Sequence, residues 1–474
     1  MLPGQSEPGE EGGIRPVSAA GRAHSQLSGK RGGWPDNWLP GDARAMADVF
    51  IRAWRQAYPG VVPDAIIAEL DHDQTARTGG PAPRLTVTYQ ELPGRSAEGY
   101  PVVSQLLIRQ LAGGVPPGLA MEVRSSAATA YSAAGGWAKL TGSAAGADLV
   151  TSAQGPVEVG AGTLFDLASL TKVIATLPLV LLLHQRGQWS IDDPVARWLP
   201  GAPRSPVTIS DCLLHIAGLV PFRQYYLTCD GPAEIKRAVT AELAGAAAGP
   251  VSYSDVGFML LGWAIENCAG ETLAGLFARE VAGPLGMTST SYLPEAPRQH
   301  IAATEADGDQ RTNPVLVWGE VHDGNAFALG GTSGHAGLFG TAADLGRFAS
   351  ALLRPDHHPV LSAETIALMT SRHTGADPEA RVLGWRVRPD QWGSWPAGTI
   401  WHTGFTGTSM LIAPTLDAAI VLLTNAVHPA RRGAEIAEFR TKVHQAVRTV
   451  LDGSPGPHDT GMPAAEASST RSRF

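Results

Sequence analysis

Hydrophobic and polar positions along the chain repeat in two ways, one typical of helices and the other of strands. Apolar residues spaced three and four apart predict helices over 45–58 and 102–111. Apolar and polar residues alternate over 84–91, which predicts a strand. The stretches 116–123 and 130–138 follow as the two strands of a predicted hairpin. The first third of the chain is therefore expected to mix helix and strand.

The rest of the chain predicts a helical middle followed by further strands. Helices are expected over 168–186, 208–216, 232–245, 255–269 and 271–281, with another starting at Asp193-Pro194. Later helices are expected over 342–353, 362–370 and 434–451, and strands over 383–387, 399–403, 409–412 and 418–424. Because strands lie at both ends of the regular region, the economical fold is α/β of the α+β type. It would be one antiparallel sheet flanked by helices, with an inserted all-helical subdomain.

Composition divides the chain into four parts. Residues 1–43 are rich in Gly, Pro, Ser and charge without an apolar repeat, which predicts a disordered leader. Residues 44–96 form an N-terminal extension whose role the pattern does not indicate. The regular domain spans 97–451, and 452–474 predict a disordered tail. With 44% hydrophobic and 17% charged residues over 474 positions, the chain fits a globular protein with a large core.

Charge and hydropathy argue against two classes of partner. The net charge of −8 argues against nucleic-acid binding. The longest apolar run, 173–183, is interrupted by Pro178 and is too short to span a bilayer. No apolar segment of a secretory signal is visible, so we expect a cytoplasmic protein without a membrane partner. Three cysteines without a CxxC pair predict free thiols.

Ser169 and Lys172 form the most informative motif, an S-x-x-K in a predicted helix. Only five of the 36 basic residues are lysines, and no other lysine has a serine three positions before it. Positions i and i+3 share a helix face, so the amine would lie beside the hydroxyl. Serine becomes a nucleophile when a base takes its proton, and burial can lower a lysine pKa enough for that role. The pattern alone leaves an incidental surface pair open.

Two further segments place polar side chains at the ends of predicted elements. Tyr253 precedes a helix that begins at Asp255, a position from which a phenol can relay protons into a cleft. His402, Thr403 and Gly404 end one strand shortly before another, and the glycine would let a substrate approach the backbone. Taken singly, each segment also fits a structural tyrosine or a structural histidine.

The order and spacing of the three motifs resemble the serine β-lactamase and penicillin-binding-protein superfamily. The similarity is to the branch of class C β-lactamases, D,D-peptidases and esterases, which has tyrosine in the second motif and often HTG in the third. Other segments resemble that branch too: FDLA before Ser169, VTISDCLLHIAGLVPF, VAGPLGMTST, GGTSGHAGLFGTAADLGRFA and LLTNAVHP. The resemblance covers about residues 97–450 and implies a β-lactamase/transpeptidase-like serine hydrolase domain over 97–451.

The resemblance implies a role for each matching residue. Ser169 matches the acylated nucleophile, Lys172 its proton-accepting partner, and Tyr253 the general base or proton relay. His402 takes the place of the lysine of a KTG motif. The backbone N–H groups of Ser169 and Phe405 would form the oxyanion hole. The substrate-binding and oxyanion residues are thus expected to be His402, Gly404, Phe405 and Asp255.

Two residues depart from the lactamase pattern. Asp255 stands where lactamases have asparagine, and its charge would favour the protonated form of Lys172, which makes Tyr253 the better base. His402 replaces lysine, and a neutral histidine binds a carboxylate less strongly than an ammonium does. These departures favour esters, amides or peptides that lack the carboxylate of a lactam antibiotic.

His322 and His335 lie in segments that could line the mouth of the site. They are secondary candidates for site residues, and a purely structural role is the alternative for each. No H-x-H-x-D cluster occurs, so we expect no metal, and the resemblance implies no organic cofactor. We predict a serine hydrolase that acts through a covalent acyl-enzyme on a small-molecule ester or amide, or on a peptide-like substrate. Two alternatives stay open: an ATP-independent transacylase that passes the acyl group to an amine, and a D,D-peptidase or penicillin-binding sensor with slow turnover.

Overall fold

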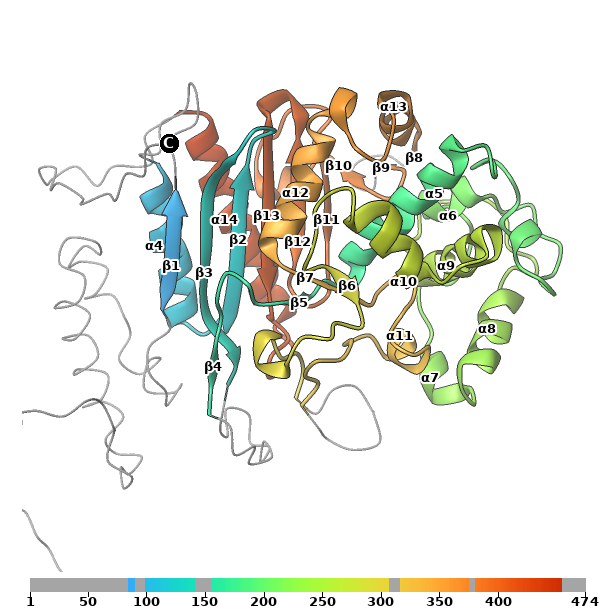
Figure 1. The fold of residues 1–474 in the computed structure, drawn as a ribbon, viewed down its shortest axis with the longest axis horizontal. Coiled ribbons are helices and arrows are strands. Elements are labelled where there is room, and N and C mark those ends of the chain that lie inside the picture. Colours follow the sequence, from blue (N-terminus) through green and yellow to red (C-terminus); the bar gives the residue numbers. More distant parts are fainter. Residues whose placement is uncertain (1–83, 90–98, 141–154, 307–315, 375–379, 454–474) are drawn as a thin grey trace, which may run out of the picture. The chain divides into compact units, whose positions relative to one another are not determined.

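The computed structural model describes residues 84–89, 99–140, 155–306, 316–374 and 380–453. The helix predicted over 45–58, the leader 1–43 and most of the tail 452–474 lie outside these residues. Figure 1 shows a broad antiparallel sheet with helices against both faces and a helical region beside it. This is the predicted α+β arrangement.

The large sheet is built from both ends of the described chain. Its strands run in the order β1-β3-β2-β13-β12-β11-β10-β9-β8, and each pair is antiparallel. The N-terminal strands are β1 (Leu85–Tyr89), β2 (Gly118–Arg124) and β3 (Thr129–Lys139), which also pairs with β4 (Val157–Glu158). The C-terminal strands are β8 (His373–Thr374), β9 (Arg381–Val382), β10 (Arg386–Val387), β11 (Ile400–Thr403), β12 (Ser409–Ala413) and β13 (Ala418–Thr424).

Both faces of the sheet are buried, which explains why its central strands are apolar throughout. All seven residues of β13 are buried. Ile420 and Leu422 join the core formed with α4 (Tyr100–Ala112) and α14 (Gly433–Leu451). The alternate residues Ala419, Val421 and Leu423 join a second core with α12 (Ala342–Leu352). The sheet thus separates two cores, and its two faces follow the period-two alternation of strand side chains.

The helical region carries the larger of these cores. Its main elements are α5 (Leu177–Gln185), α6 (Ile209–Leu213), α7 (Tyr225–Thr228), α8 (Pro232–Ala241), α9 (Asp255–Ala269), α10 (Leu273–Leu276), α11 (Gly324–Ala328) and α13 (Ala363–Ser371). Short 3-10 or π segments span Ala168–Leu170, Lys172–Thr176, Val195–Trp198, Phe277–Ala282, Arg298–His300, Pro355–His357, Asp390–Trp392 and Pro414–Leu416. The stretch Ala168–Gln185 is long and apolar enough to cross a membrane, but 83% of it is buried inside the protein, as in a core helix. The three cysteines are free, as predicted.

Two local predictions were wrong, and one small sheet was not predicted. The strand expected over 383–387 is instead two short strands, β9 and β10, because Gly384 turns the chain at φ +76° against Leu177. Asp193 does not cap a helix: its carboxylate accepts the N–H of Ser190, and a single 3-10 turn follows Pro194. A second sheet, β5 (Phe165–Asp166), β7 (Leu338–Gly340) and β6 (Ser291–Tyr292), has strands too short to leave an alternating pattern.

Asn425 joins the C-terminal and N-terminal strands where β13 ends. Its Oδ1 accepts the N–H of Gly118 at 2.9 Å, and its Nδ2 donates to the carbonyl oxygens of Trp137 at 3.1 Å and Ala138 at 3.2 Å. The side chain is 1% exposed. Water therefore cannot replace these bonds when the amide is removed.

We expect Asn425→Ala to lower the free energy of unfolding by about 2–4 kcal/mol, because the buried Gly118 N–H and Trp137 carbonyl lose their bonds to the amide. The Ala138 carbonyl keeps the N–H of Ala303 at 2.7 Å. Urea denaturation followed by circular dichroism measures this change. Asn267→Ala is the matched control, since that exposed amide makes one bond, to Trp198, and should cost less than about 0.5 kcal/mol. Equal stability of the two variants would contradict the proposed strand link.

Candidate active site

Ser169 lies in a short 3-10 turn that follows β5. The carboxylate of Asp166 accepts the N–H of Ala168 at 2.8 Å and the N–H of His322 at 2.7 Å, which fixes the chain just before the serine. Ala168 has φ +47°, a left-handed conformation that non-glycine residues adopt only under local constraint. The turn brings Ser169 to the wall of a pocket.

Lys172 sits directly behind Ser169 and is fully buried. Its Nζ donates to Ser169 Oγ at 2.9 Å and to the carbonyl oxygen of His335 at 3.0 Å, and it lies 2.7 Å from a carboxylate oxygen of Asp255. Burial acts to lower the pKa of Lys172, but Asp255 and Tyr253 outweigh it and hold the pKa above its usual value. Lys172 is therefore an ammonium ion at neutral pH.

Close backbone packing places the carbonyl group that meets Lys172. Thr176, one turn further along the helix, donates its hydroxyl to the oxygen of Gly334 at 2.6 Å. A Cβ on Gly334 would lie 2.1 Å from the carbonyl oxygen of Phe258 on α9. Glycine is thus required where the Gly-rich segment 330–337 crosses α9, and this crossing brings His335 to the buried amine.

Tyr253 reaches the pocket from the loop before α9. Ser254 begins that helix as its N-cap, with its hydroxyl accepting the N–H of Gly257. The Tyr253 ring packs with its centroid 4.5 Å from that of His215, whose Nδ1 accepts the N–H of Ser254 at 2.9 Å. The Nζ of Lys172 lies 5.1 Å from the centroid of the phenol ring. His215 therefore fixes the tyrosine, a role that its sequence context did not reveal.

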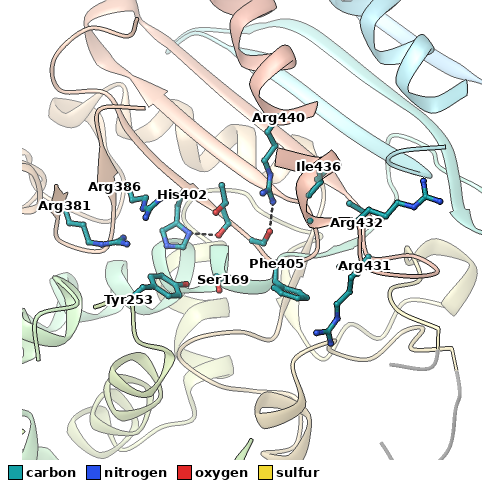
Figure 2. A pocket seen from close by; sticks show the side chains of 15 residues that line it. Ser169, Tyr253, Arg381, Arg386, His402, Phe405, Arg431, Arg432, Ile436 and Arg440 are labelled. Atoms are coloured by element: carbon teal, nitrogen blue, oxygen red, sulfur yellow. Dashed lines mark hydrogen bonds between the residues drawn. The ribbon is translucent and has the colours of Figure 1, made fainter. Parts of the chain in front are cut away.

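His402, on β11, faces Tyr253 across the pocket, as Figure 2 shows. Its Nδ1 lies 2.9 Å from the carbonyl oxygen of Thr403, which can only accept, so Nδ1 carries the proton. Burial, with the charges of Lys172 and Arg381, holds the pKa of His402 well below its usual value. His402 is therefore neutral and does not replace the positive charge of a lysine at this position.

The turn 404–408 between β11 and β12 passes close to the chain before Ser169. A Cβ on Gly404 would lie 2.6 Å from the carbonyl oxygen of Leu167. Thr408 donates its hydroxyl to that oxygen at 3.2 Å, and Thr406 donates to the oxygen of Asp166 at 2.7 Å. The backbone N–H of Phe405 donates to no atom of the described residues. It is left available at the pocket beside Ser169.

The two secondary candidates, His322 and His335, are held in structural contacts and do not line the pocket. His335 binds Asp323 through Nε2 at 2.9 Å and Ser333 through Nδ1 at 2.8 Å, so only its backbone meets Lys172. The ring of His322 binds Glu305 at 2.9 Å and stacks on Phe405 with centroids 5.5 Å apart. His322 thus supports a wall of the pocket rather than its chemistry.

The pocket has a volume of about 490 Å³ and combines the motif residues with a group of arginines. Its walls include Ser169, Tyr253, and 402–405. Five arginines also line it: Arg381, Arg386, Arg431, Arg432 and Arg440. No motif connects these arginines in the sequence, because two come from the β9–β10 hairpin and three from the region where α14 begins. Among the described residues, no three His, Cys, Asp or Glu side chains are grouped as metal ligands.

Comparisons with known proteins match this arrangement. The family model described as Beta-lactamase matches residues 103–445. A protein of Escherichia coli O157:H7, provisionally named a D-alanyl-D-alanine carboxypeptidase, is 31% identical over 73% of this chain and 86% of its own length. An N-acetylmuramyl-L-alanine amidase of Bacillus subtilis is 31% identical over 69% of this chain and 80% of its own. The octameric penicillin-binding protein homologue of Pyrococcus abyssi shares the fold, with 19% identity, a TM-score of 0.56 and coverage of 74% and 77%.

The match to the family model covers most of the described chain, and the two relatives are aligned over two thirds of it or more. The expectation drawn from the three motifs is confirmed for the fold and the superfamily. The chain therefore belongs to the Beta-lactamase family, within the serine β-lactamase and penicillin-binding-protein superfamily, and is a serine hydrolase of that superfamily.

Proposed function

We propose that Ser169 is the nucleophile of an acyl-transfer reaction. Tyr253 takes the proton of its hydroxyl, and the charge of Lys172 assists this transfer. One observation carries the proposal. The hydroxyl of Ser169 opens onto the pocket while its oxygen accepts a hydrogen bond from a fully buried ammonium ion that Asp255 neutralises. An incidental surface pair would not have this burial. Ser169 attacks the carbonyl carbon, the leaving group departs with a proton, and water then releases the acyl group.

Tyr253 is the base in this proposal, because Lys172 already carries its proton. Tyr253 takes the serine proton in its phenolate form, whose negative charge the ammonium of Lys172 stabilises. Lys172 also steadies Ser169 Oγ by donating to it. The same phenol can return the proton to the leaving group, which balances the step. Asp255 acts through Lys172 and keeps the amine charged.

The tetrahedral oxyanion would be bound by the backbone N–H groups of Ser169 and Phe405. The turn 404–408 is tied to the chain before Ser169 by the hydroxyl groups of Thr406 and Thr408, so the two donors are held near each other. Losing one such donor typically costs about 10²–10³ in rate.

We propose a peptide-like amide with a carboxylate group as the substrate class. The names of two relatives point to cell-wall peptides: D-alanyl-D-alanine carboxypeptidase and N-acetylmuramyl-L-alanine amidase. Sequence reasoning expected weak carboxylate binding because His402 is neutral, but the arginines of the pocket supply the positive charge that His402 lacks. Arg386 on β10 lies opposite the buried Arg381 on β9 in the strand register. Arg386 is the more accessible of the two. The names of the relatives thus favour the D,D-peptidase alternative over a general esterase. The cytoplasmic location of the protein stays a prediction.

We expect Ser169→Ala to lower kcat/KM for p-nitrophenyl acetate and butyrate by at least about 10³-fold and to abolish a single fluorophosphonate adduct in the intact mass. Ser104→Ala is the control, since that hydroxyl, on α4, binds Tyr131 of β3 away from the pocket, and the variant should keep wild-type activity. Retention of activity and adduct in Ser169→Ala would refute the assignment. Product analysis with added amines separates hydrolysis from transacylation.

The second prediction concerns pH. Because Asp255 helps to raise the pKa of Lys172, Asp255→Asn leaves burial as the dominant effect and lowers that pKa. Lys172 then loses its proton at a lower pH. The alkaline limb of kcat/KM against pH should therefore move down by about 1–3 pH units. Asp344→Asn removes a buried carboxylate elsewhere and should leave the limb in place. An unmoved limb in Asp255→Asn would mean that Lys172 need not be charged.

The substrate class is tested with an N-acylated D-alanyl-D-alanine peptide and the same peptide as its C-terminal amide. We expect the wild type to prefer the free carboxylate, and Arg386→Met to raise KM for that peptide about tenfold through loss of a charge-assisted hydrogen bond. KM for the amide should change less than about twofold. Arg448→Met, a change outside the pocket, is the control. Equal cleavage of both peptides by the wild type would contradict an anionic substrate.

A further inference from the structure

One side chain of α14 holds the turn 404–408 from the side opposite Ser169. Arg440 donates from Nη2 to the carbonyl oxygens of Gly404 at 2.6 Å and Thr408 at 2.9 Å, and from Nε to that of Gly407 at 3.1 Å. Figure 2 shows the guanidinium reaching the turn from α14, with Ser169 on the other side of it. A planar guanidinium that binds three carbonyl oxygens fixes the orientation of the turn as well as its position.

The bonds to the Gly404 oxygen fix where the next N–H points. Arg440 Nη2 donates to this oxygen at 2.6 Å, and the N–H of Gly407 in the same turn donates to it at 3.1 Å. The C=O of Gly404 and the N–H of Phe405 belong to one planar trans peptide unit, in which they point in opposite directions. Because Arg440 draws the Gly404 oxygen toward α14, the Phe405 N–H is directed away from α14. That N–H is the one that makes no hydrogen bond with the described residues.

The turn is thus held from two sides by different groups. On the side of the nucleophile, Thr406 and Thr408 donate to the backbone oxygens of Asp166 and Leu167 and set the distance between the turn and Ser169. These bonds do not involve the peptide unit between Gly404 and Phe405. On the other side, Arg440 binds that unit itself. The threonines therefore position the turn, and Arg440, together with the N–H of Gly407, sets the direction of its exposed donor.

We propose that Arg440 is a positioning residue that aims the Phe405 N–H at the developing oxyanion. The inference rests on the proposed function, because it takes Phe405 as the oxyanion donor. It also separates Arg440 from the other arginines of the pocket: Nη2 and Nε are committed to the backbone, so this guanidinium orients the turn instead of binding the substrate carboxylate. Loss of Arg440 should then lower kcat, whereas loss of a carboxylate-binding arginine raises KM.

Paired esters test this role, since backbone N–H donors stabilise a developing O⁻ better than a developing S⁻. We expect Arg440→Met to lower kcat for p-nitrophenyl acetate by about 10–10²-fold with KM changed less than about threefold. For p-nitrophenyl thionoacetate the decrease should be much smaller, so the ratio of oxo-ester to thiono-ester rates falls at least about fivefold. Equal losses for the two esters would show a merely structural role and overturn the proposal.

Arg448→Met is the matched control, because Arg448 lies on the same helix and donates to the carbonyl oxygen of Ser394 at 2.9 Å, outside the pocket. It should leave the ester ratio unchanged. If Arg440→Met does not fold, Arg440→Lys replaces it, with a partial loss in the same ratio expected. Millimolar guanidinium, well below denaturing concentrations, should restore the oxo-ester rate of Arg440→Ala at least about threefold, and no restoration would contradict the orienting role.

A failure of the underlying function has a different signature. If Ser169→Ala kept its activity, the acyl-enzyme proposal would fall whatever Arg440 does. If Ser169→Ala were inactive and the ester ratio stayed constant in every Arg440 variant, only the role of Arg440 would be wrong.

Discussion

A buried ammonium ion constrains the whole site. Lys172 has no contact with water, so its charge is tolerable only if polar groups surround it. Ser169, the carbonyl oxygen of His335 and the carboxylate of Asp255 provide those groups, and each comes from a different part of the chain. Meeting this electrostatic requirement therefore brings together the turn that carries Ser169, the Gly-rich segment and the start of α9.

Close backbone packing explains why two glycines near the site cannot be replaced freely. Gly334 lets the Gly-rich segment touch α9, and Gly404 lets the turn 404–408 touch the chain before Ser169. Both contacts are between backbones, where even a methyl group would not fit. The site is thus assembled by close approach of main chains, with side chains added at its surface. This arrangement gives the backbone N–H of Phe405 a defined place.

The sequence predicted the parts of this structure that depend on local pattern. The strand 418–424 was predicted at its observed bounds, and the helix predicted over 434–451 begins one residue earlier, because a long buried element leaves a long run of apolar or periodic positions. Motif spacing singled out Ser169, Lys172 and Tyr253, and the structure brings the three together at the pocket. The close contact of Asp255 with Lys172 agreed with the electrostatic argument made from the sequence, and the raised pKa of Lys172 follows from it.

Features that arise from contacts between distant segments had no sequence signal. Arg381 and Arg440 reach one pocket from different elements, and the three-strand sheet β5-β7-β6 has strands of only two or three residues. His322 and His335 looked like candidates because histidine in a Gly-rich context is conspicuous. Their rings are in fact taken up by Glu305 and Asp323. Contacts between side chains that are far apart in the sequence determine these features, and motif spacing does not predict such contacts.

The pairing of β2 with β13 also sets the order in which this protein can mature. Gly118 and Asn425, which close that pair, are 307 residues apart in the chain. During synthesis from the N-terminus, β2 and β3 can form their hairpin early, but one edge of β2 stays without its partner until β13 is made. Contacts at such long separation slow folding, because a large loop must close before they are formed. The turn 404–408 and α14 also come late, so Ser169 meets its proposed oxyanion partner only near the end of folding, and a nascent chain carries Ser169 before the pocket around it exists.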